Sequence, residues 1–200
     1  MTRSVPVTPI PDMMFGRARF WVVLICAGLL AACAGPQPSS FDSQFERAGR
    51  FLVQVVEPAG KTESVQGGFR WRQNESGWQL DLISPLGATL ARLDANASGV
   101  VLQRPGEMPR RAATAALLVS ELFYAQVPVD AMSDWIRGRI VQASDVQSIE
   151  RDAQNRVVSM SQAGWKIRFD RYDDHGPRLV EVTGVDQGRD VRMRMIVDGP

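Results

Sequence analysis

Apolar and polar side chains alternate along most of the chain, and this period of two constrains the fold more than any other feature of the sequence. Phe69 and Trp71, for example, fall on one side of a stretch that carries Arg70 and Arg72 on the other. Successive residues of a β-strand point to opposite faces of a sheet, so the pattern predicts strands with one apolar face. The stretches with this pattern are 49–57, 63–73, 77–84, 87–94, 99–105, 156–162, 164–172, 178–186 and 189–198. Their short length and the turn residues between them predict an antiparallel meander.

The number of strands and one long interruption define the fold class. Nine or ten strands are predicted, and a weaker one over 146–151 brings the number to about eleven. Between Thr114 and Gly138 the period changes to that of two amphipathic helices, the second of them capped by Asp130. The apolar positions of these helices are Leu118, Leu122, Met132, Trp135 and Ile136. We therefore expect a mainly β domain with inserted helices, its sheet curved strongly or closed toward a barrel.

Two smaller patterns give further local expectations. Ser43 and Glu46 have the spacing of a capping box, so a short helix is expected to begin at Ser43. The segment Gln66–Gly68 contains two glycines inside a strand pattern, and no P-loop lysine follows it. A β-bulge or a bend is therefore expected there, and a phosphate site is not.

The N-terminal part carries a short apolar run, Phe20–Ala32, directly after Arg17 and Arg19. The run has 13 residues, whereas a membrane-spanning helix needs about 20. A short apolar run behind positive charge is typical of a bacterial signal peptide. Met13 or Met14 fits the start as well as the first residue does, because both arginines follow them.

The apolar run ends in Leu-Ala-Ala-Cys, which resembles the lipobox of bacterial lipoproteins. The resemblance implies cleavage before Cys33 and covalent attachment of a diacylglycerol and an N-acyl chain to Cys33, with no other cofactor. Residues 1–32 are then a removed signal peptide. Residues 33–43 are the lipidated cysteine and a tether rich in Pro, Gly and Ser, and 44–200 form the folded domain. Ala34 follows the cysteine where an Asp would favour retention in the inner membrane, so an outer-membrane location is expected.

The composition disfavours most catalytic and metal-binding sites. Cys26 lies in the removed segment, so Cys33 is the only cysteine left and neither a disulfide nor a cysteine metal cluster is expected. The only histidine, His175, lies in an apparent loop beside Asp173 and Asp174, which suits solvation better than a catalytic pair. Formal net charge is +1 and no basic block is present, so nucleic acid is not an expected partner. An enzyme is disfavoured.

Several segments together resemble the LolB family, the outer-membrane lipoprotein receptors of the lipoprotein-sorting (Lol) pathway. The most specific are a Pro-Leu-Gly turn between two strands and the pattern Pro-x-x-x-Met-x-x-Trp-Ile-x-Gly. The resemblance extends over about 45–198, and its segments are Phe69–Gln73, Trp78–Leu93, Val127–Gly138 and Gly164–Tyr172. It implies a half-open antiparallel barrel of about eleven strands whose opening is covered by a helical lid.

The resemblance also implies a function without covalent chemistry. LolB-like proteins accept triacylated lipoproteins from the soluble periplasmic carrier LolA in an apolar cavity and insert them into the outer membrane. The expected partners are thus a LolA-type carrier, the lipoprotein cargo and outer-membrane lipid, with the receptor itself a monomer. Two other classes stay open from the residues alone: an envelope-assembly lipoprotein that binds other envelope proteins, and a hydrolase without familiar motifs.

The predicted cavity is lined by apolar residues on the strand faces. The expected lining residues are Trp71, Trp78, Leu80, Trp165, Ile167, Phe169, Met193 and Met195. The expected lid residues are Leu118, Leu122, Met132, Trp135 and Ile136. Met and Trp suit a deformable lining. The same residues also suit an ordinary filled core, and the pattern alone does not separate the two interpretations.

Leu86 lies at the tip of the predicted turn, between Pro85 and Gly87, where polar residues are usual. The residues alone favour a leucine that folds back onto the domain. The resemblance to LolB implies instead a projecting turn that delivers cargo to the membrane. Asp81, in the strand before the turn, departs from the family pattern because it is charged. If its side chain faces inward, it places this charge at the rim of the cavity.

Overall fold

The computed structural model describes residues 41–142 and 145–199, and within them eleven strands form one antiparallel sheet. The spatial order is β6-β5-β4-β3-β2-β1-β11-β10-β9-β8-β7, so β6 and β7 are edges and the sheet is open. The strands are β1 (Phe45–Val56), β2 (Thr62–Asn74), β3 (Gly77–Ile83), β4 (Thr89–Asn96), β5 (Gly99–Gln103), β6 (Arg110–Ala112), β7 (Val146–Arg151), β8 (Val157–Gln162), β9 (Trp165–Asp173), β10 (Gly176–Asp186) and β11 (Arg189–Val197). The predicted half-open sheet is confirmed. The expected signal peptide, Cys33 and residues 34–40 lie outside the described residues.

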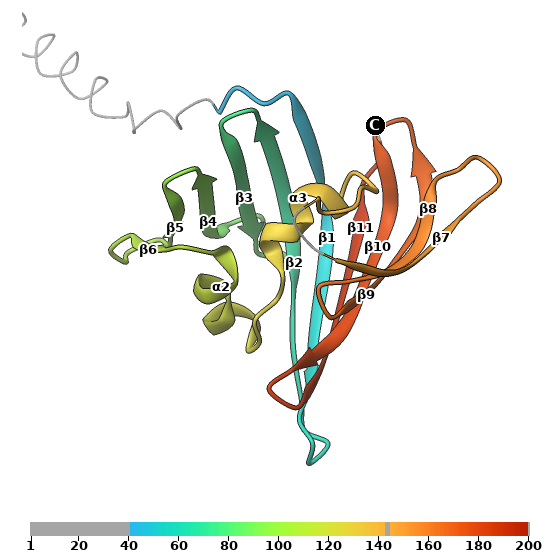
Figure 1. Cartoon of the computed structure of the whole chain (residues 1–200). Helices are drawn as coiled ribbons and strands as arrows, with labels where there is room; N and C mark the ends of the chain where they lie inside the picture. Colours follow the sequence, from blue (N-terminus) through green and yellow to red (C-terminus); the bar gives the residue numbers. More distant parts are fainter. Residues whose placement is uncertain (1–40, 143–144, 200) are drawn as a thin grey trace, which may run out of the picture. The chain divides into compact units, whose positions relative to one another are not determined.

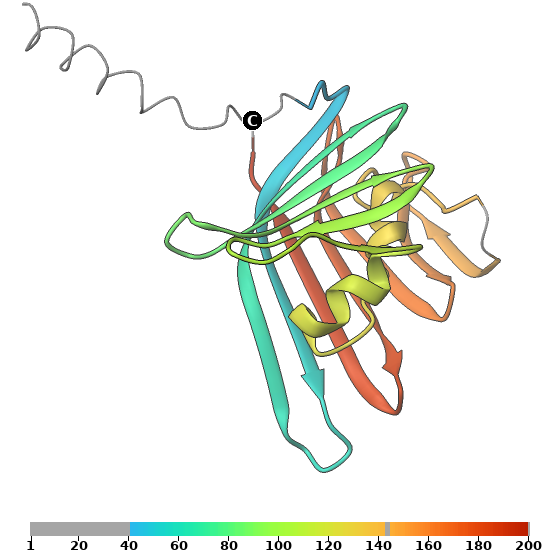
Figure 2. The same cartoon turned by 90° about the vertical axis from the view of Figure 1, so that its left-hand side faces the viewer.

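The sheet curves around three short helical segments on its concave side (Figures 1 and 2). These are the α-helix α2 (Ala115–Phe123), the 3₁₀ turn η1 (Val129–Ala131) and the α-helix α3 (Met132–Trp135). Because all three lie between β6 and β7 in the sequence, they connect the two edges of the open sheet across its hollow.

Register in the middle of the sheet places large apolar residues opposite one another on the concave face. Phe51 of β1 pairs with Met195 of β11, and Val53 pairs with Met193. All four side chains are buried. Direct cross-strand neighbours on one face are the contacts that stabilise a sheet, so the core runs along this face and under the helices.

The expected helix at Ser43 is wrong, because β1 already begins at Phe45. β1 pairs along its length with β2 and along most of it with β11, and these two ladders supply far more hydrogen bonds than one helical cap. Glu46, expected to complete the capping box, lies 3.4 Å from Arg70 of β2 as an ion pair instead.

Of the bulge or bend expected at Gln66–Gly68, the bulge is wrong. The β1–β2 register continues without a shift through this segment. A Cβ added at Gly67 would lie 2.5 Å from the carbonyl oxygen of Ile83, so the glycine is required by a close approach of β3.

Asp130 caps a different helix from the one predicted. Its carboxylate accepts hydrogen bonds from the backbone N–H groups of Ala115 at 2.9 Å and Ala116 at 3.4 Å, the first residues of α2. A carboxylate at this position satisfies free N–H groups and complements the helix dipole. The predicted second helix is reduced to η1 and the four residues of α3.

Candidate functional site

An apolar cavity of about 30 Å³ lies between the concave face and the helices. Four strands form its wall, and α2, η1 and α3 each add one residue to its roof. The wall residues are Phe51, Phe69, Trp71, Leu80, Leu82, Met193 and Met195, and the roof residues are Phe123, Val129 and Met132. The volume is about that of one water molecule in the liquid, so in this conformation the helices fill the hollow.

Half of the predicted wall residues line this cavity. Trp71, Leu80, Met193 and Met195 do so, and Met132 is the one predicted lid residue in the roof. The others lie elsewhere in the core: Trp78, Ile167, Phe169, Leu118, Trp135 and Ile136 are buried, Leu122 is partly buried, and Trp165 is partly buried where it covers Gly184. Trp78 stacks on Trp71 with ring centroids 4.7 Å apart, so it supports the wall from one side.

Five lining residues were missed by sequence reasoning. Phe69 and Leu82 share the strand faces of Trp71 and Leu80, so alternation alone identifies them. Phe51 and Phe123 contact each other edge to face, with ring centroids 5.7 Å apart. Phe123 follows Val119 at a spacing of four, a helical stripe beside the predicted one. Val129 lies in η1, where no helical period is available to identify it.

The α3 segment is attached to the sheet through the buried amide of Gln162 in β8. The indole Nε1 of Trp135 donates to Gln162 Oε1 at 3.2 Å, and Val141 N donates to the same oxygen at 3.0 Å. Gln162 Nε2 donates in return to the Val141 carbonyl at 2.7 Å. A buried amide with these partners fixes the segment that contains Met132.

The C-terminal end of α2 is attached to the turn between β10 and β11. Arg189 Nη1 donates to the Tyr124 carbonyl at 2.6 Å, and Gln126 N donates to Asp186 Oδ2 at 3.2 Å. The N-terminal end is held by Asp130 of η1, as described above. Polar contacts therefore hold both ends of α2, whereas the residues that the lid places over the cavity are apolar.

Leu86 projects from the domain with 97% of its surface exposed. Gly87 N donates to the Ser84 carbonyl at 2.9 Å, and Ala88 N donates to Ser84 Oγ at 3.1 Å, so the turn is closed below the leucine. Gly87 has φ +87°, which a residue with a side chain adopts only with strain. The expectation that Leu86 folds back is wrong: Pro85, Leu86 and Gly87 are all exposed.

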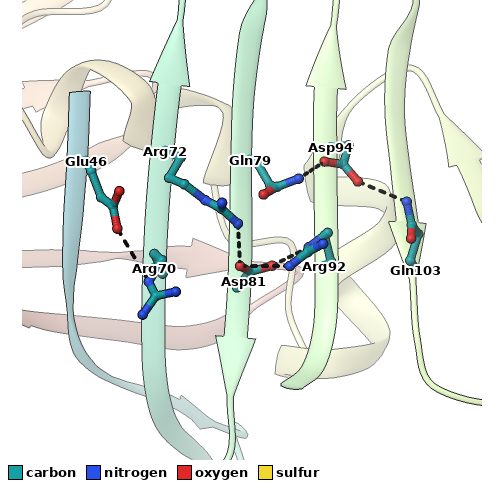
Figure 3. Close-up of polar contacts among 8 residues, drawn as sticks. All are labelled: Glu46, Arg70, Arg72, Gln79, Asp81, Arg92, Asp94 and Gln103. Carbon is teal, nitrogen blue, oxygen red and sulfur yellow. Dashed lines mark hydrogen bonds and ion pairs between the residues drawn. The ribbon is translucent and has the colours of Figure 1, made fainter. Parts of the chain in front are cut away.

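Below this turn, the convex face carries a polar ladder across β1 to β5 (Figure 3). Asp81 is buried between two guanidinium groups, with Oδ1 2.5 Å from Arg92 Nε and Oδ2 2.9 Å from Arg72 Nη2. This hydrogen bonding raises the pKa of Arg92. Beside it Gln79 donates to Asp94, which also accepts from Gln103. Asp81 thus faces away from the cavity and bridges the strands on both sides of β3.

Asp173, which lies close to His175 in the sequence, forms an ion pair with Arg47. Asp173 Oδ1 lies 2.8 Å from Arg47 Nη1, and His175 is exposed in the following turn. Burial alone raises the pKa of Asp173, but hydrogen bonds from Arg47 and the His175 backbone outweigh it and hold that pKa below its ordinary value. Within the described residues, no group of three or more His, Cys, Asp or Glu side chains is arranged to hold a metal ion.

Comparison with known proteins identifies relatives along nearly the whole chain. The family model described as "Outer membrane lipoprotein LolB" matches residues 43–199. Outer-membrane lipoprotein LolB of Bordetella petrii is 37% identical over 187 residues, which are 92% of this chain and 94% of that protein. Outer-membrane lipoprotein LolB of Cupriavidus necator is 35% identical over 189 residues, covering 88% and 95%. The crystal structure of a LolA superfamily protein from Nitrosomonas europaea is 10% identical, covers 78% of this chain and 88% of that one, and has a TM-score of 0.42.

The family match spans every strand of the sheet and all three helical segments. Across the described ranges, no helix is both long and apolar enough to cross a membrane. The chain belongs to the LolB family of outer-membrane lipoproteins.

Proposed function

We propose that this protein holds the acyl chains of a lipoprotein between its concave sheet face and its lid, and passes them to the outer membrane at the Leu86 turn. As a member of the LolB family it is a lipoprotein receptor of the Lol pathway and not an enzyme. This membership favours the receptor over the envelope-assembly alternative. The observation that carries the proposal is the cavity whose lining residues are all apolar and whose roof is made by the helices.

The energetic reason for such a receptor is the cost of exposing acyl chains to water. Each CH₂ group taken out of water contributes about 0.8 kcal/mol, so a triacylated protein does not cross the periplasm unshielded. The wall residues offer aromatic rings and two methionines, Met193 and Met195, whose flexible side chains adapt to a chain that is itself flexible.

The lid must move before cargo enters, because a cavity of about 30 Å³ does not hold an acyl chain. Withdrawal of Phe123, Val129 and Met132 would merge the cavity with the space that the lid now fills. The sheet permits this, since its two edges, β6 and β7, are not paired with each other. Acyl chains then replace the apolar contacts that the roof residues lose.

Release is proposed to occur where Leu86 contacts lipid. Burial of a leucine is worth about 1.5–3 kcal/mol, which biases a transient contact without anchoring the protein. Anchoring is proposed to come from the acyl chains on Cys33. The ten residues 34–43 span at most about 35 Å, so they keep the domain beside the membrane. The receptor is proposed to act as a monomer. A LolA-type carrier is the proposed donor of cargo.

A matched pair of lid variants tests the cavity. Met132 lines the cavity, whereas Leu117 of α2 is 53% exposed on the opposite side of the lid. In the mature chain with Cys33→Ala, Met132→Gln should weaken binding of a fluorescent fatty acid and slow transfer of a lipoprotein from LolA. Leu117→Gln should leave both unchanged. Equal effects of the two variants, or a protein that binds no fatty acid at all, would exclude the proposed cavity.

A further inference from the structure

A second apolar side chain of the domain is exposed almost as fully as Leu86. Met108, in the connection between β5 and β6, is 87% exposed. In the described residues these two are the most exposed of the large apolar side chains. Exposed apolar side chains contribute little to folding, so a pair at neighbouring positions calls for a partner outside the domain.

Topology brings the two side chains to the same end of the sheet. β4 pairs with β3 on one side and with β5 on the other, so the β3–β4 and β5–β6 connections both leave the end opposite the β4–β5 turn. Figure 2 shows them projecting on the same side of the domain, the β3–β4 turn in green and the β5–β6 connection in lighter green. Neighbouring strands lie about 4.8 Å apart, so the two hairpins are centred about 10 Å apart.

The β3–β4 connection extends further from the sheet than the β5–β6 connection does (Figure 2). The β3–β4 ladder continues to Thr89, three residues beyond the level at which Arg92 pairs with Gln103 at the end of β5. Three strand residues span about 10 Å. The β5–β6 connection turns back directly after β5, because Glu107 N donates to the Arg104 carbonyl. A bilayer that touches both connections therefore lies oblique to the strands.

The β5–β6 connection is built to hold Met108 outward. Glu107 N donates to the Arg104 carbonyl at 3.2 Å, and Gly106 has φ +77°, which closes a turn just before the methionine. Pro105 and Pro109 fix the backbone on both sides of this turn. Met108 therefore stands on a constrained loop and not on a free one.

Positive charge surrounds Met108 but not Leu86. Residues 104–111 contain three arginines and one glutamate, whereas 84–90 contain no charged residue. Arg104 lies 3.1 Å from Glu107, and Arg110 pairs with Glu121 of α2. Arg111 is exposed and has no ion pair within the part of the chain that the structure describes. Apolar side chains beside cations match the boundary between acyl chains and anionic headgroups of a bilayer.

We infer that the β5–β6 connection is a second membrane-contacting loop, in which Met108 enters the acyl boundary and Arg111 binds lipid phosphate. The inference rests on the proposed delivery role of the Leu86 turn, which it extends. Two contacts, about 10 Å apart across the strands, define a line on the bilayer, whereas one contact leaves the domain free to rotate about it. The loop thus orients the end of the sheet from which both turns project toward the membrane during release.

Single cysteines placed in the mature lipoprotein test this directly, because the only native cysteine of the mature chain carries the lipid anchor. The protein is reconstituted in vesicles of phosphatidylethanolamine and phosphatidylglycerol and labelled with an environment-sensitive fluorophore at Met108→Cys, Leu86→Cys or Ala97→Cys. Ala97 is exposed in the β4–β5 turn, at the opposite end of the sheet. Quenching by nitroxide-labelled lipid is expected at 108 and 86 and not at 97.

The possible outcomes test membrane contact by the β5–β6 connection separately from membrane contact by the Leu86 turn. Quenching at 86 without quenching at 108 overturns the second loop and leaves the Leu86 role intact. Quenching at 108 without quenching at 86 supports the second loop and contradicts the Leu86 role. Equal quenching at all three positions overturns the oriented contact.

The charge component has its own test. Arg111→Gln, combined with the label at position 108, should reduce the membrane-contacting fraction about fivefold in the same vesicles, as expected for one cation lost near an anionic surface. The reduction should disappear in vesicles of phosphatidylcholine alone. An equal reduction in both kinds of vesicle would overturn the role of Arg111 in binding anionic headgroups.

Discussion

The cavity and the turn end of the sheet use the same residue types in opposite environments. Leu80 and Met132 are buried in the cavity lining, whereas Leu86 and Met108 are exposed almost completely. Burial of the first pair accompanies folding and stabilises the domain, but the second pair gains nothing from folding. Apolar character alone therefore does not identify a core residue, and the turn end is apolar for contact with something outside the domain.

The largest expected effect separates the two regions by stability. Phe69→Ala removes a buried ring from the cavity wall and should lower the free energy of unfolding by about 3–5 kcal/mol. Leu86→Ala should change it by less than about 0.5 kcal/mol, because the side chain touches little. Urea unfolding of the mature chain measures both, and similar losses for the two variants would remove the distinction.

The next effect separates the regions by function. Leu86→Glu should leave folding and acceptance of cargo nearly intact but slow insertion into the membrane about tenfold to a hundredfold, which corresponds to about 1.5–3 kcal/mol of lost burial. Acceptance is measured by transfer from LolA, and insertion by recovery of cargo in vesicles. Loss of cargo binding, with insertion per bound cargo unchanged, would place the leucine with the cavity instead.

The polar ladder gives a smaller effect confined to the turn end. Asp81→Asn removes the charge between Arg72 and Arg92 and should lower the free energy of unfolding by about 1–3 kcal/mol. Amide hydrogen exchange in β3 and β4 should increase more than in β10 and β11. A uniform increase over the whole sheet would show that the ladder does not support the turn end locally.

The smallest effect depends on pH and lies away from both regions. The folded-state pKa of Asp173 is lowered, so its pairing with Arg47 stabilises the fold above the ordinary carboxyl pKa of about 4. Asp173→Asn should cost about 1 kcal/mol at neutral pH. The difference from the parent chain should shrink as pH falls through the lowered pKa, where the parent carboxylate is itself protonated. A difference that does not change with pH would indicate that packing, and not the ion pair, matters there.

Sequence reasoning recovered what depends on local pattern. Alternation such as that of Phe69 to Arg72 gave the strands and their apolar faces, and the helical spacing at Leu118 and Leu122 marked the lid. It failed where distant contacts decide the outcome. The pairing of β1 with two strands overrode the cap at Ser43, and Asp130 caps a helix that precedes it in the chain.

The cavity was predictable only in part for the same reason. Which strand faces are apolar follows from alternation, but which residues meet beneath the lid depends on how the sheet curves. Phe51 and Phe123, 72 positions apart in the sequence, therefore became neighbours that no local pattern could indicate. The exposure of Leu86 was likewise decided by the closed turn below it, which holds the side chain away from the domain.

Acyl chains are proposed to occupy the space between the concave face and the lid. Cross-linking tests this with a lipoprotein that carries photoreactive acyl chains, which is passed from LolA to the mature receptor with Cys33→Ala and irradiated before membrane is added. We expect cross-links at cavity residues such as Leu80, Met132 and Met193, and none at convex-face residues such as Arg92 or Arg194. Cross-links confined to the convex face would show that the acyl chains do not bind beneath the lid.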